Sequence, residues 1–180
     1  MRLIAGTLKG RRLSAPAGRK VRPTGERLKE SLFSALGGLC RGASVLDLFA
    51  GSGNLGFEAL SRGAALATFV EKDRAVWRCL NANAAALGVE ANCRIICAEA
   101  FAFIAGPAGE TGYSLIFADP PFDSGFAGRV YSWWLESGAR NPVLVLQYPS
   151  SEPPTTDQAG PAPLKSATFG ESSYSIFLRE

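Results

Sequence analysis

One eleven-residue stretch, 44–54, constrains the fold of this chain more than any other. It reads Ser-Val-Leu-Asp-Leu-Phe-Ala-Gly-Ser-Gly-Asn. The apolar residues up to Phe49 predict a strand that is buried on both faces of a parallel sheet. Gly51 and Gly53 predict a tight turn whose backbone N–H groups can approach a ligand, and Asn54 is placed to cap the following helix. A strand, a glycine turn and a helix N-terminus together predict a nucleotide-type pocket at the carboxyl end of the sheet.

After this stretch, strands and helices alternate along the chain. Further strands are expected at 66–71, 93–97, 113–118 and 143–148, and the chain closes with an antiparallel pair at 164–169 and 174–178. The alternation predicts an α/β fold with an open, mostly parallel, Rossmann-like sheet of seven strands. The final pair, with no helix between its members, is typical of class I methyltransferases rather than of a plain dinucleotide-binding domain.

The charges are distributed unevenly over the 180 residues. Residues 1–41 hold ten Lys and Arg against two acids, a charge of +8, and the remainder holds nine against fourteen, a charge of −5. We expect residues 1–22 to form a basic β-hairpin arm with a connector, and residues 23–180 to form the main domain. Such an arm favours contact with a nucleic acid, and the alternative is a solvated tail that only aids solubility. The candidate RNA-binding residues are Lys9, Arg11, Arg12, Arg19, Lys20 and Arg22.

The cysteine and histidine content excludes several kinds of chemistry. The chain has no histidine, so serine-histidine and cysteine-histidine catalysis are excluded. Its four cysteines form no C-x-x-C pair, which predicts that no metal is bound. Cys93 and Cys97 are expected to be buried free thiols on a strand. Since no apolar run approaches the length of a membrane span and no signal peptide is recognisable, we expect a soluble, cytoplasmic protein.

The turn and its surroundings indicate an adenosine-type cofactor. Residues 51–56 satisfy G-x-G-x-x-G, and Glu71, twenty residues after Gly51, can accept hydrogen bonds from both ribose hydroxyls. These features do not separate NAD from S-adenosylmethionine. Asp47 favours the latter, because a buried carboxylate could bind the amino group of the sulfonium cofactor but would repel a pyrophosphate. The alternative is that Asp47 bonds only to local backbone.

The sharpest motif is Asp119-Pro120-Pro121-Phe122, which directly follows a buried strand. The Asp119 carboxylate and the Pro120 carbonyl are two acceptors on a rigid segment, and this pair suits an exocyclic NH₂ group. Holding that amine by both hydrogens would aim its lone pair at a methyl donor, while Phe122 could stack on a base that has left its helix. The alternative is an ordinary Asp-Pro turn. Trp133 and Trp134 could form a stacking platform, but at least one is expected in the core.

These motifs resemble those of the RsmD family, whose members methylate the N2 of one guanine in bacterial 16S ribosomal RNA. The matching segments are 46–53, 71–73 and 119–122, together with the N-terminal patterns at 2–6, 10–13 and 22–33. The resemblance implies that Asp119, Pro120, Pro121 and Phe122 hold the guanine amine. It implies S-adenosylmethionine as cofactor, leaving as S-adenosylhomocysteine, without a metal. The implied cofactor contacts are Asp47, Phe49, Ala50, Gly51, Gly53, Glu71, Lys72, Glu99 and Ala100.

The same resemblance implies a monomer whose arm docks on 16S RNA in the small subunit or its assembly intermediate. Two positions depart from the family pattern: Glu99 stands where a shorter Asp is usual, and residues 147–149 replace a more acidic stretch, so no function is assigned there. Three alternatives remain open. They are an amino-methyltransferase for adenine N6 or a protein amide, an NAD-dependent oxidoreductase, and a non-catalytic RNA-binding module.

Overall fold

The computed structural model describes residues 1–15, 25–107, 112–122, 125–137, 142–154 and 160–179. Its α-helices are α1 (Glu26–Leu36), α2 (Asn54–Ser61), α3 (Arg74–Leu87), α4 (Ala100–Ile104) and α5 (Phe126–Glu136), and its short 3₁₀ helices are η1 (Gly37–Cys40) and η2 (Glu90–Asn92). The strands are β1 (Ser44–Leu48), β2 (Leu66–Glu71), β3 (Cys93–Cys97), β4 (Leu115–Ala118), β5 (Val143–Pro149), β6 (Lys165–Phe169) and β7 (Ser172–Leu178).

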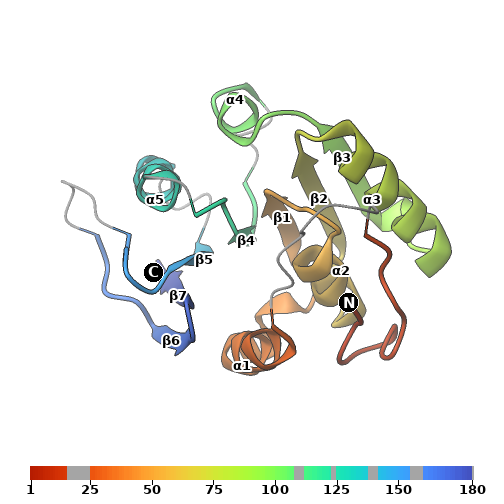
Figure 1. Cartoon of the computed structure of the whole chain (residues 1–180), viewed down its shortest axis with the longest axis horizontal. Coiled ribbons are helices and arrows are strands. Elements are labelled where there is room, and N and C mark those ends of the chain that lie inside the picture. The colour runs from red at the N-terminus through yellow and green to blue at the C-terminus, as the bar shows by residue number, and fades with distance from the viewer. Residues whose placement is uncertain (16–24, 108–111, 123–124, 138–141, 155–159, 180) are drawn as a thin grey trace.

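The described strands form a single seven-stranded sheet in the order β3-β2-β1-β4-β5-β7-β6 (Figure 1). The first five strands run parallel, and β7 pairs antiparallel with both β5 and β6. The predicted α/β class, the mostly parallel sheet and the antiparallel closing pair are confirmed. The order reverses between β1 and β4, and such a switch point is where open α/β sheets bind their ligands.

Helices cover both faces of the sheet. The apolar sides of α1, α2 and α3 pack on the face that carries Val45, Phe69 and Phe117. On the other face, α4 and α5 pack over Leu46 and Ile116 (Figure 1). Because neighbouring residues of β1 and β4 point into opposite cores, β4 is buried throughout and β1 is buried after Ser44, as their apolar runs predict.

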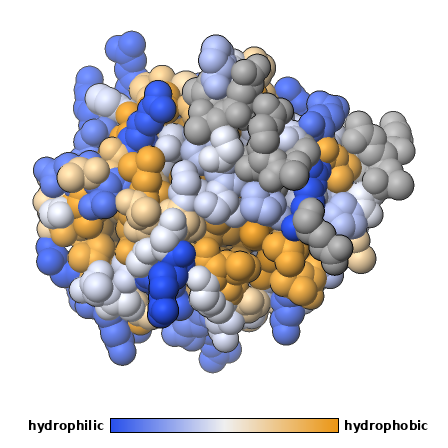
Figure 2. All heavy atoms as spheres, turned by 180° about the vertical axis from the view of Figure 1, so that it is seen from behind, coloured by the Kyte–Doolittle hydropathy of each residue, from blue (hydrophilic) through white to orange (hydrophobic). Residues whose placement is uncertain are grey.

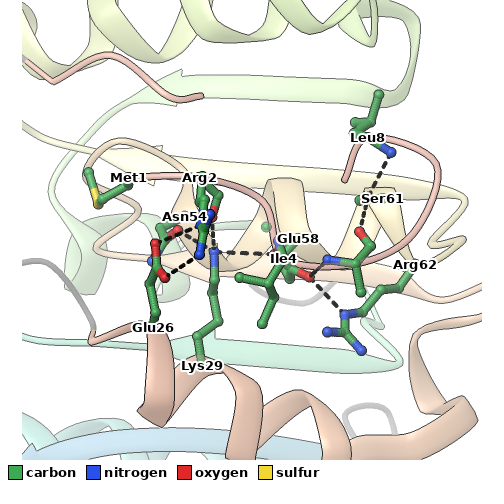
Figure 3. A network of polar contacts seen from close by, with 12 residues as sticks. Met1, Arg2, Ile4, Leu8, Glu26, Lys29, Asn54, Glu58, Ser61 and Arg62 are labelled. Carbon is green, nitrogen blue, oxygen red and sulfur yellow. Dashed lines mark hydrogen bonds and ion pairs between the residues drawn. The ribbon is translucent and has the colours of Figure 1, made fainter. Parts of the chain in front are cut away.

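The N-terminal hairpin pairs as predicted but is held mainly by the body of the protein. Only Arg2 and Arg12 form an antiparallel bridge, because the N–H groups of Ile4 and Ala5 donate to the Glu58 carboxylate on α2 instead of to the opposite strand (Figure 3). The side chains of Leu3 and Leu13 belong to the main core. The proposed boundary between arm and domain falls within 16–24, outside the described residues.

A glycine allows this hairpin to lie against α2. Gly6 has a φ of 81°, and a Cβ atom there would lie 1.8 Å from the Ser61 carbonyl oxygen. The neighbouring N–H of Thr7 donates to that oxygen over 2.8 Å, and the N–H of Leu8 donates to the Ser61 hydroxyl (Figure 3). The hairpin turn is therefore fixed to the end of α2 by contacts that only glycine permits at position 6.

Several local predictions were wrong for physical reasons. Asn54 is the first residue of α2, not its cap, and its side chain instead accepts a hydrogen bond from the Lys29 ammonium. Cys93 is half-buried and Cys97 is exposed, because β3 is the outermost strand of the parallel part of the sheet. Trp134 is buried in the core, as expected for at least one of the two tryptophans.

Among the described residues, the large apolar side chains that are exposed are Leu39, Leu66, Leu164 and Leu178. By the direction of their strands they belong to the edge of the sheet where the parallel strands begin. In Figure 2, apolar residues reach the surface in the middle of the face shown, with hydrophilic residues mostly toward its outline. None of the helices in the described part of the chain is long and apolar enough to cross a membrane.

Candidate active site

A cavity of about 780 Å³ opens at the carboxyl ends of the parallel strands, a size that suits a small-molecule site. The cavity brings together residues that were predicted from separate segments. All members of the predicted catalytic and cofactor sets line it except Gly53. Gly53 lies behind the turn with a φ of 82°, where a Cβ atom would meet the ring of Phe57 at 2.4 Å. Its role is therefore to let the turn pack on α2.

The backbone N–H groups of the glycine turn are already used within the protein. Gly51 donates to the Glu71 carboxylate over 3.0 Å, Gly53 donates to the Ala50 carbonyl, and Ala50 donates to the Val70 carbonyl. The expectation that the N–H groups of both glycines approach a ligand is therefore wrong for this structure. A loop that binds phosphate needs such donors to point at the anion, and this turn uses them internally.

Phe49 carries a backbone feature that the sequence did not predict. The strand β1 ends at Leu48, and Phe49 adopts a φ of 61°, the only positive φ outside glycine among the described residues. This conformation is uncommon for a bulky residue and is typical of functional sites. It places the Phe49 ring against Phe101 and Phe126, at centroid distances of 5.9 and 6.3 Å, and in the cavity wall.

Asp47 is a buried carboxyl group beneath the turn. Its Oδ2 accepts a hydrogen bond of 2.9 Å from the N–H of Gly56 on α2, which is the local-backbone contact considered for it. Burial raises the pKa of Asp47 well above its usual value, the Gly56 N–H opposes the shift, and the charges of Asp119 and Glu71 raise it further. The charges of Asp119 and Glu71 thus act on Asp47 beside the cavity, which gives this end of the site an acidic lining.

Glu71 and Glu99, at the ends of β2 and β3, line the cavity and also accept hydrogen bonds from the backbone. The Glu71 carboxylate accepts from the N–H groups of Gly51 and Asp73, so it ties the glycine turn to the loop that starts α3. The exposed Glu99 caps α4 by accepting from the Ala102 N–H over 2.8 Å. Lys72 and Ala100 lie next to these acids in the same wall.

The Asp-Pro-Pro-Phe segment follows β4 and forms another part of the wall. Asp119 and Phe122 are half-buried, Pro120 is buried and Pro121 is exposed. Because β4 lies next to β1 in the sheet, this segment emerges beside the glycine turn, as the sequence predicts. Asp119 therefore lies at the mouth of the turn and not in the interior.

Other residues of the wall were not found from the sequence. Gly25, Arg27 and Leu28 reach it from the start of α1, the turn between β6 and β7 contributes 169–172, and Gln147 reaches it from β5. Gln147 lies within β5 and belongs to no motif, so the sequence held no signal for it. The contribution of α1 carried no signal either, because a helix at the start of the chain can pack in many places.

The predicted RNA-binding residues that the structure describes lie on the hairpin. Lys9, Arg11 and Arg12 are exposed, and the guanidinium group of Arg11 also donates to the Ala86 carbonyl near the end of α3. The other three candidates, Arg19, Lys20 and Arg22, lie outside the described residues. The exposed Arg27 in the cavity wall extends the basic surface from the hairpin side toward the site.

Comparison with known proteins assigns the chain to a family. Residues 1–178 match the family model described as Conserved hypothetical protein 95. Ribosomal RNA small subunit methyltransferase D of Escherichia coli K12 is 35% identical over 182 residues, which cover 100% of this chain and 90% of that protein. The chain belongs to the RsmD family.

Two solved structures extend this result to the fold. The Escherichia coli protein yhhF superposes with a TM-score of 0.85 at 34% identity, and the match covers 100% of this chain and 98% of that one. A T. thermophilus structure described as the 16S rRNA N2 G1207 methyltransferase RsmC with AdoMet and guanosine superposes with a TM-score of 0.62 at 23% identity, covering 91% of this chain and 44% of that one. The second likeness shows the fold alone. The chain thus has the Rossmann-like class I methyltransferase fold over its whole described length.

Proposed function

We propose that this RsmD family member transfers a methyl group from S-adenosylmethionine to the N2 amine of a guanine in 16S ribosomal RNA. The observation that carries the proposal is a single cavity lined both by the acid-rich glycine turn and by Asp119–Phe122. A donor site and an acceptor site that share one wall are what a direct transfer between two bound molecules needs. The names of the family relatives support ribosomal RNA as the substrate.

The residues at the turn fit a cationic adenosine cofactor better than NAD. The charges of Glu71 and Asp119 act on Asp47 beside the cavity, and these two charges would attract a sulfonium cation and repel a pyrophosphate. The N–H groups of Gly51 and Gly53 are bonded within the protein and are therefore not directed at a phosphate. Glu71 lies in the cavity wall, where its carboxylate would accept from a ribose hydroxyl of the cofactor.

On the acceptor side, the chain's own residues orient the amine. When bound, the cofactor supplies an electrophilic methyl group on a sulfonium sulfur. Asp119 and the Pro120 carbonyl would accept the two amine hydrogens and aim the nitrogen lone pair at that methyl group. Phe122 would stack on the base once it has left its helix, which contributes about 1–3 kcal/mol. Transfer of the methyl group from the sulfur to the nitrogen would release the amine proton, which Asp119 or water would accept.

A methyl-transfer assay tests the proposal directly. Small ribosomal subunits from cells that lack this activity are incubated with the protein and methyl-labelled S-adenosylmethionine, and the RNA is digested to nucleosides. We expect label in N2-methylguanosine at one mapped position. Label in N6-methyladenosine or in ribosomal protein would identify the amino-methyltransferase alternatives instead. If no methyl group is transferred to any substrate and calorimetry shows that NADH binds, the oxidoreductase alternative is favoured.

The raised pKa of Asp47 predicts that binding of the cofactor and of its product respond differently to pH. Above the usual pKa of an aspartic acid and below the raised one, Asp47 is protonated in the folded protein. A bound sulfonium cation favours the carboxylate, so its binding releases this proton and tightens as pH rises through the raised pKa. The neutral thioether of S-adenosylhomocysteine lacks the sulfonium charge and keeps only the amino group that both ligands share. We therefore expect the affinity ratio of the two ligands to shift toward S-adenosylmethionine with increasing pH.

Calorimetry with both ligands between about pH 5 and pH 8 measures this ratio. The comparison cancels the titrating groups that the two ligands share. Asp47→Asn keeps an acceptor for the Gly56 N–H and is expected to make the ratio independent of pH. If the affinities of both ligands change equally with pH in the wild-type protein, Asp47 does not interact with the sulfonium cation.

The hairpin is expected to bind the phosphate backbone of the RNA. Lys9 and Arg12 are exposed on it. Replacing both by Ala should weaken binding to the small subunit and reduce the slope of log K against log salt by about one for each phosphate that is no longer neutralised. Binding of S-adenosylhomocysteine should not change. The matched control is Arg94→Ala with Lys165→Ala, which removes two exposed charges from β3 and β6, the outermost strands of the sheet, and equal losses of affinity in both double variants would contradict a specific role for the hairpin.

A further inference from the structure

The side chain of Gln147 is a feature of the cavity that the proposed transfer does not use. It lies on β5, is 2% exposed and lines the cavity. Its Nε2 is the one buried side-chain polar atom for which the described residues provide no hydrogen-bond partner. A buried donor without a partner destabilises a folded protein, so such a group calls for an explanation outside the apoprotein's own stability.

The polar groups next to Gln147 on β7 are bonded to other partners. Across the sheet Gln147 pairs with Tyr174 of β7, whose hydroxyl is already hydrogen-bonded to Ser31 on α1 over 2.9 Å. The neighbouring Tyr148 hydroxyl is bonded to Ser175 over 2.7 Å. The polar groups on β7 are thus satisfied elsewhere, and a rotation of the Gln147 side chain, which lines the cavity, would bring its unpaired donor to a bound molecule.

The sheet places Gln147 beside Asp119 and away from the cofactor residues. Ala118 pairs with Leu146, so Asp119 and Gln147 are the next residues on neighbouring strands, which are about 4.8 Å apart. In the strand order β2-β1-β4-β5, Asp119 lies between the glycine turn on one side and Gln147 on the other. A base held at Asp119 would present its remaining edge to the β5 side of the cavity.

We propose that Gln147 recognises the target base by donating a hydrogen bond from its carboxamide to O6 of guanine. This inference rests on the proposed function. Guanine carries its N2 amine and the O6 acceptor at the two ends of its Watson–Crick edge. With the amine at Asp119, O6 lies toward β5 and meets a donor. An adenine in the same orientation has no amine at C2, and its N6 amino group would place a second donor against the Gln147 donor. Gln147 therefore favours guanine over adenine.

The test combines a change in the protein with a change in the base. The substrates are small subunits reconstituted with RNA that carries either guanine or 2-aminopurine at the position methylated by the wild-type protein. 2-Aminopurine keeps the amine at C2 but lacks O6. We expect wild-type kcat/KM to favour guanine by about 10- to 100-fold. In Gln147→Met, kcat/KM on guanine should fall by a similar factor and the preference should disappear, with S-adenosylhomocysteine binding unchanged.

Stability separates this role from a purely structural one. Gln147→Met removes a buried amide nitrogen that has no partner among the described residues, so we expect a Tm equal to or above that of the wild-type protein even though methylation is slower. The matched control is Ser175→Ala, which removes a satisfied buried hydroxyl on β7 and should lower the Tm without changing kcat/KM. Gln147→Glu, which keeps the size but lacks the donor, should lose the preference as well.

The outcomes of this experiment distinguish the two proposals. If the wild-type protein methylates guanine and the Gln147→Met and Gln147→Glu variants keep its preference over 2-aminopurine, the role of Gln147 is refuted while the proposed function stands. If the wild-type protein methylates neither RNA, the proposed function and the inference that rests on it are both wrong.

Discussion

Replacing Asp119 by Ala is expected to reduce kcat for methyl transfer by about 10²- to 10⁴-fold. The variant keeps the rigid prolines and the stacking face of Phe122 but loses one of the two acceptors that orient the amine. Without it, the lone pair is no longer aimed at the methyl group. Because Asp119 lies beside the glycine turn and not in it, the affinity for S-adenosylmethionine should change only a few-fold.

Labelled methyl transfer to small subunits under single-turnover conditions measures the chemical step, and calorimetry with S-adenosylhomocysteine measures cofactor-site integrity. Asp119→Asn, which retains one acceptor oxygen, should lie between the wild-type protein and Asp119→Ala. The control Glu90→Ala removes an exposed acid outside the cavity and should leave both measurements unchanged. Near-normal turnover in Asp119→Ala would show that this residue does not orient the amine for methyl transfer.

The part of the site that could be predicted comes from residues whose place follows from strand order alone. Glu71 and Asp119 each come at or directly after the end of a buried parallel strand, and parallel strands end at one edge of a sheet. Their meeting at one cavity is therefore a consequence of the fold class. The glycine turn was located for the same reason, since it follows the first of these strands.

The details that were not predicted depend on contacts between distant segments. The expectation that the glycine N–H groups face a ligand failed because Glu71, twenty residues later, takes the N–H of Gly51. The left-handed conformation of Phe49 is fixed by packing against α4 and α5, which no local pattern encodes. Gln147 carries no motif at all, and its significance appears only from an unsatisfied atom in the folded structure.

The packing of the hairpin on the domain also depends on contacts between distant segments and could not be predicted. Its basic composition correctly located exposed arginines and a lysine, but it suggested an arm separate from the domain. The eight residues of α2 are all buried, since the sheet covers one side of the helix and the hairpin covers the other. Glu58 and Lys29, which in sequence are ordinary helix-surface residues, are consequently 0% and 1% exposed.

Replacing Glu58 by Gln is expected to lower the free energy of unfolding by about 3–5 kcal/mol. The Glu58 carboxylate accepts from the N–H groups of Ile4 and Ala5, pairs with the Lys29 ammonium at 3.2 Å and pairs with Arg62 at 2.9 Å (Figure 3). All four partners are donors, so the NH₂ group of a glutamine would face a donor wherever it pointed. The buried ammonium would lose its counter-charge as well.

Lys29 makes this loss severe. Burial lowers the pKa of Lys29 and the charge of Glu58 counteracts that shift, so the ammonium depends on Glu58 to remain charged in the core. Its other partners, the Arg2 carbonyl and the Asn54 side chain, are neutral. Chemical denaturation of the wild-type protein and of Glu58→Gln measures the difference. Glu26→Gln is the matched control, because it breaks the exposed Arg2–Glu26 pair, and it should cost about 1 kcal/mol or less.

A double variant tests whether the cost comes from the unpaired charge. Lys29→Met combined with Glu58→Met leaves no buried ion, and replacing a buried pair by apolar side chains of similar volume is often neutral or stabilising. We expect it to be more stable than Glu58→Met alone, although the N–H groups of Ile4 and Ala5 still lack their acceptor and prevent full recovery. Asn54, which bonds to Lys29, also lines the cavity, so Glu58→Met alone should weaken S-adenosylhomocysteine binding before it unfolds the protein. A Glu58→Gln variant as stable as Glu26→Gln would mean that the hairpin and α1 are held to α2 by apolar packing alone.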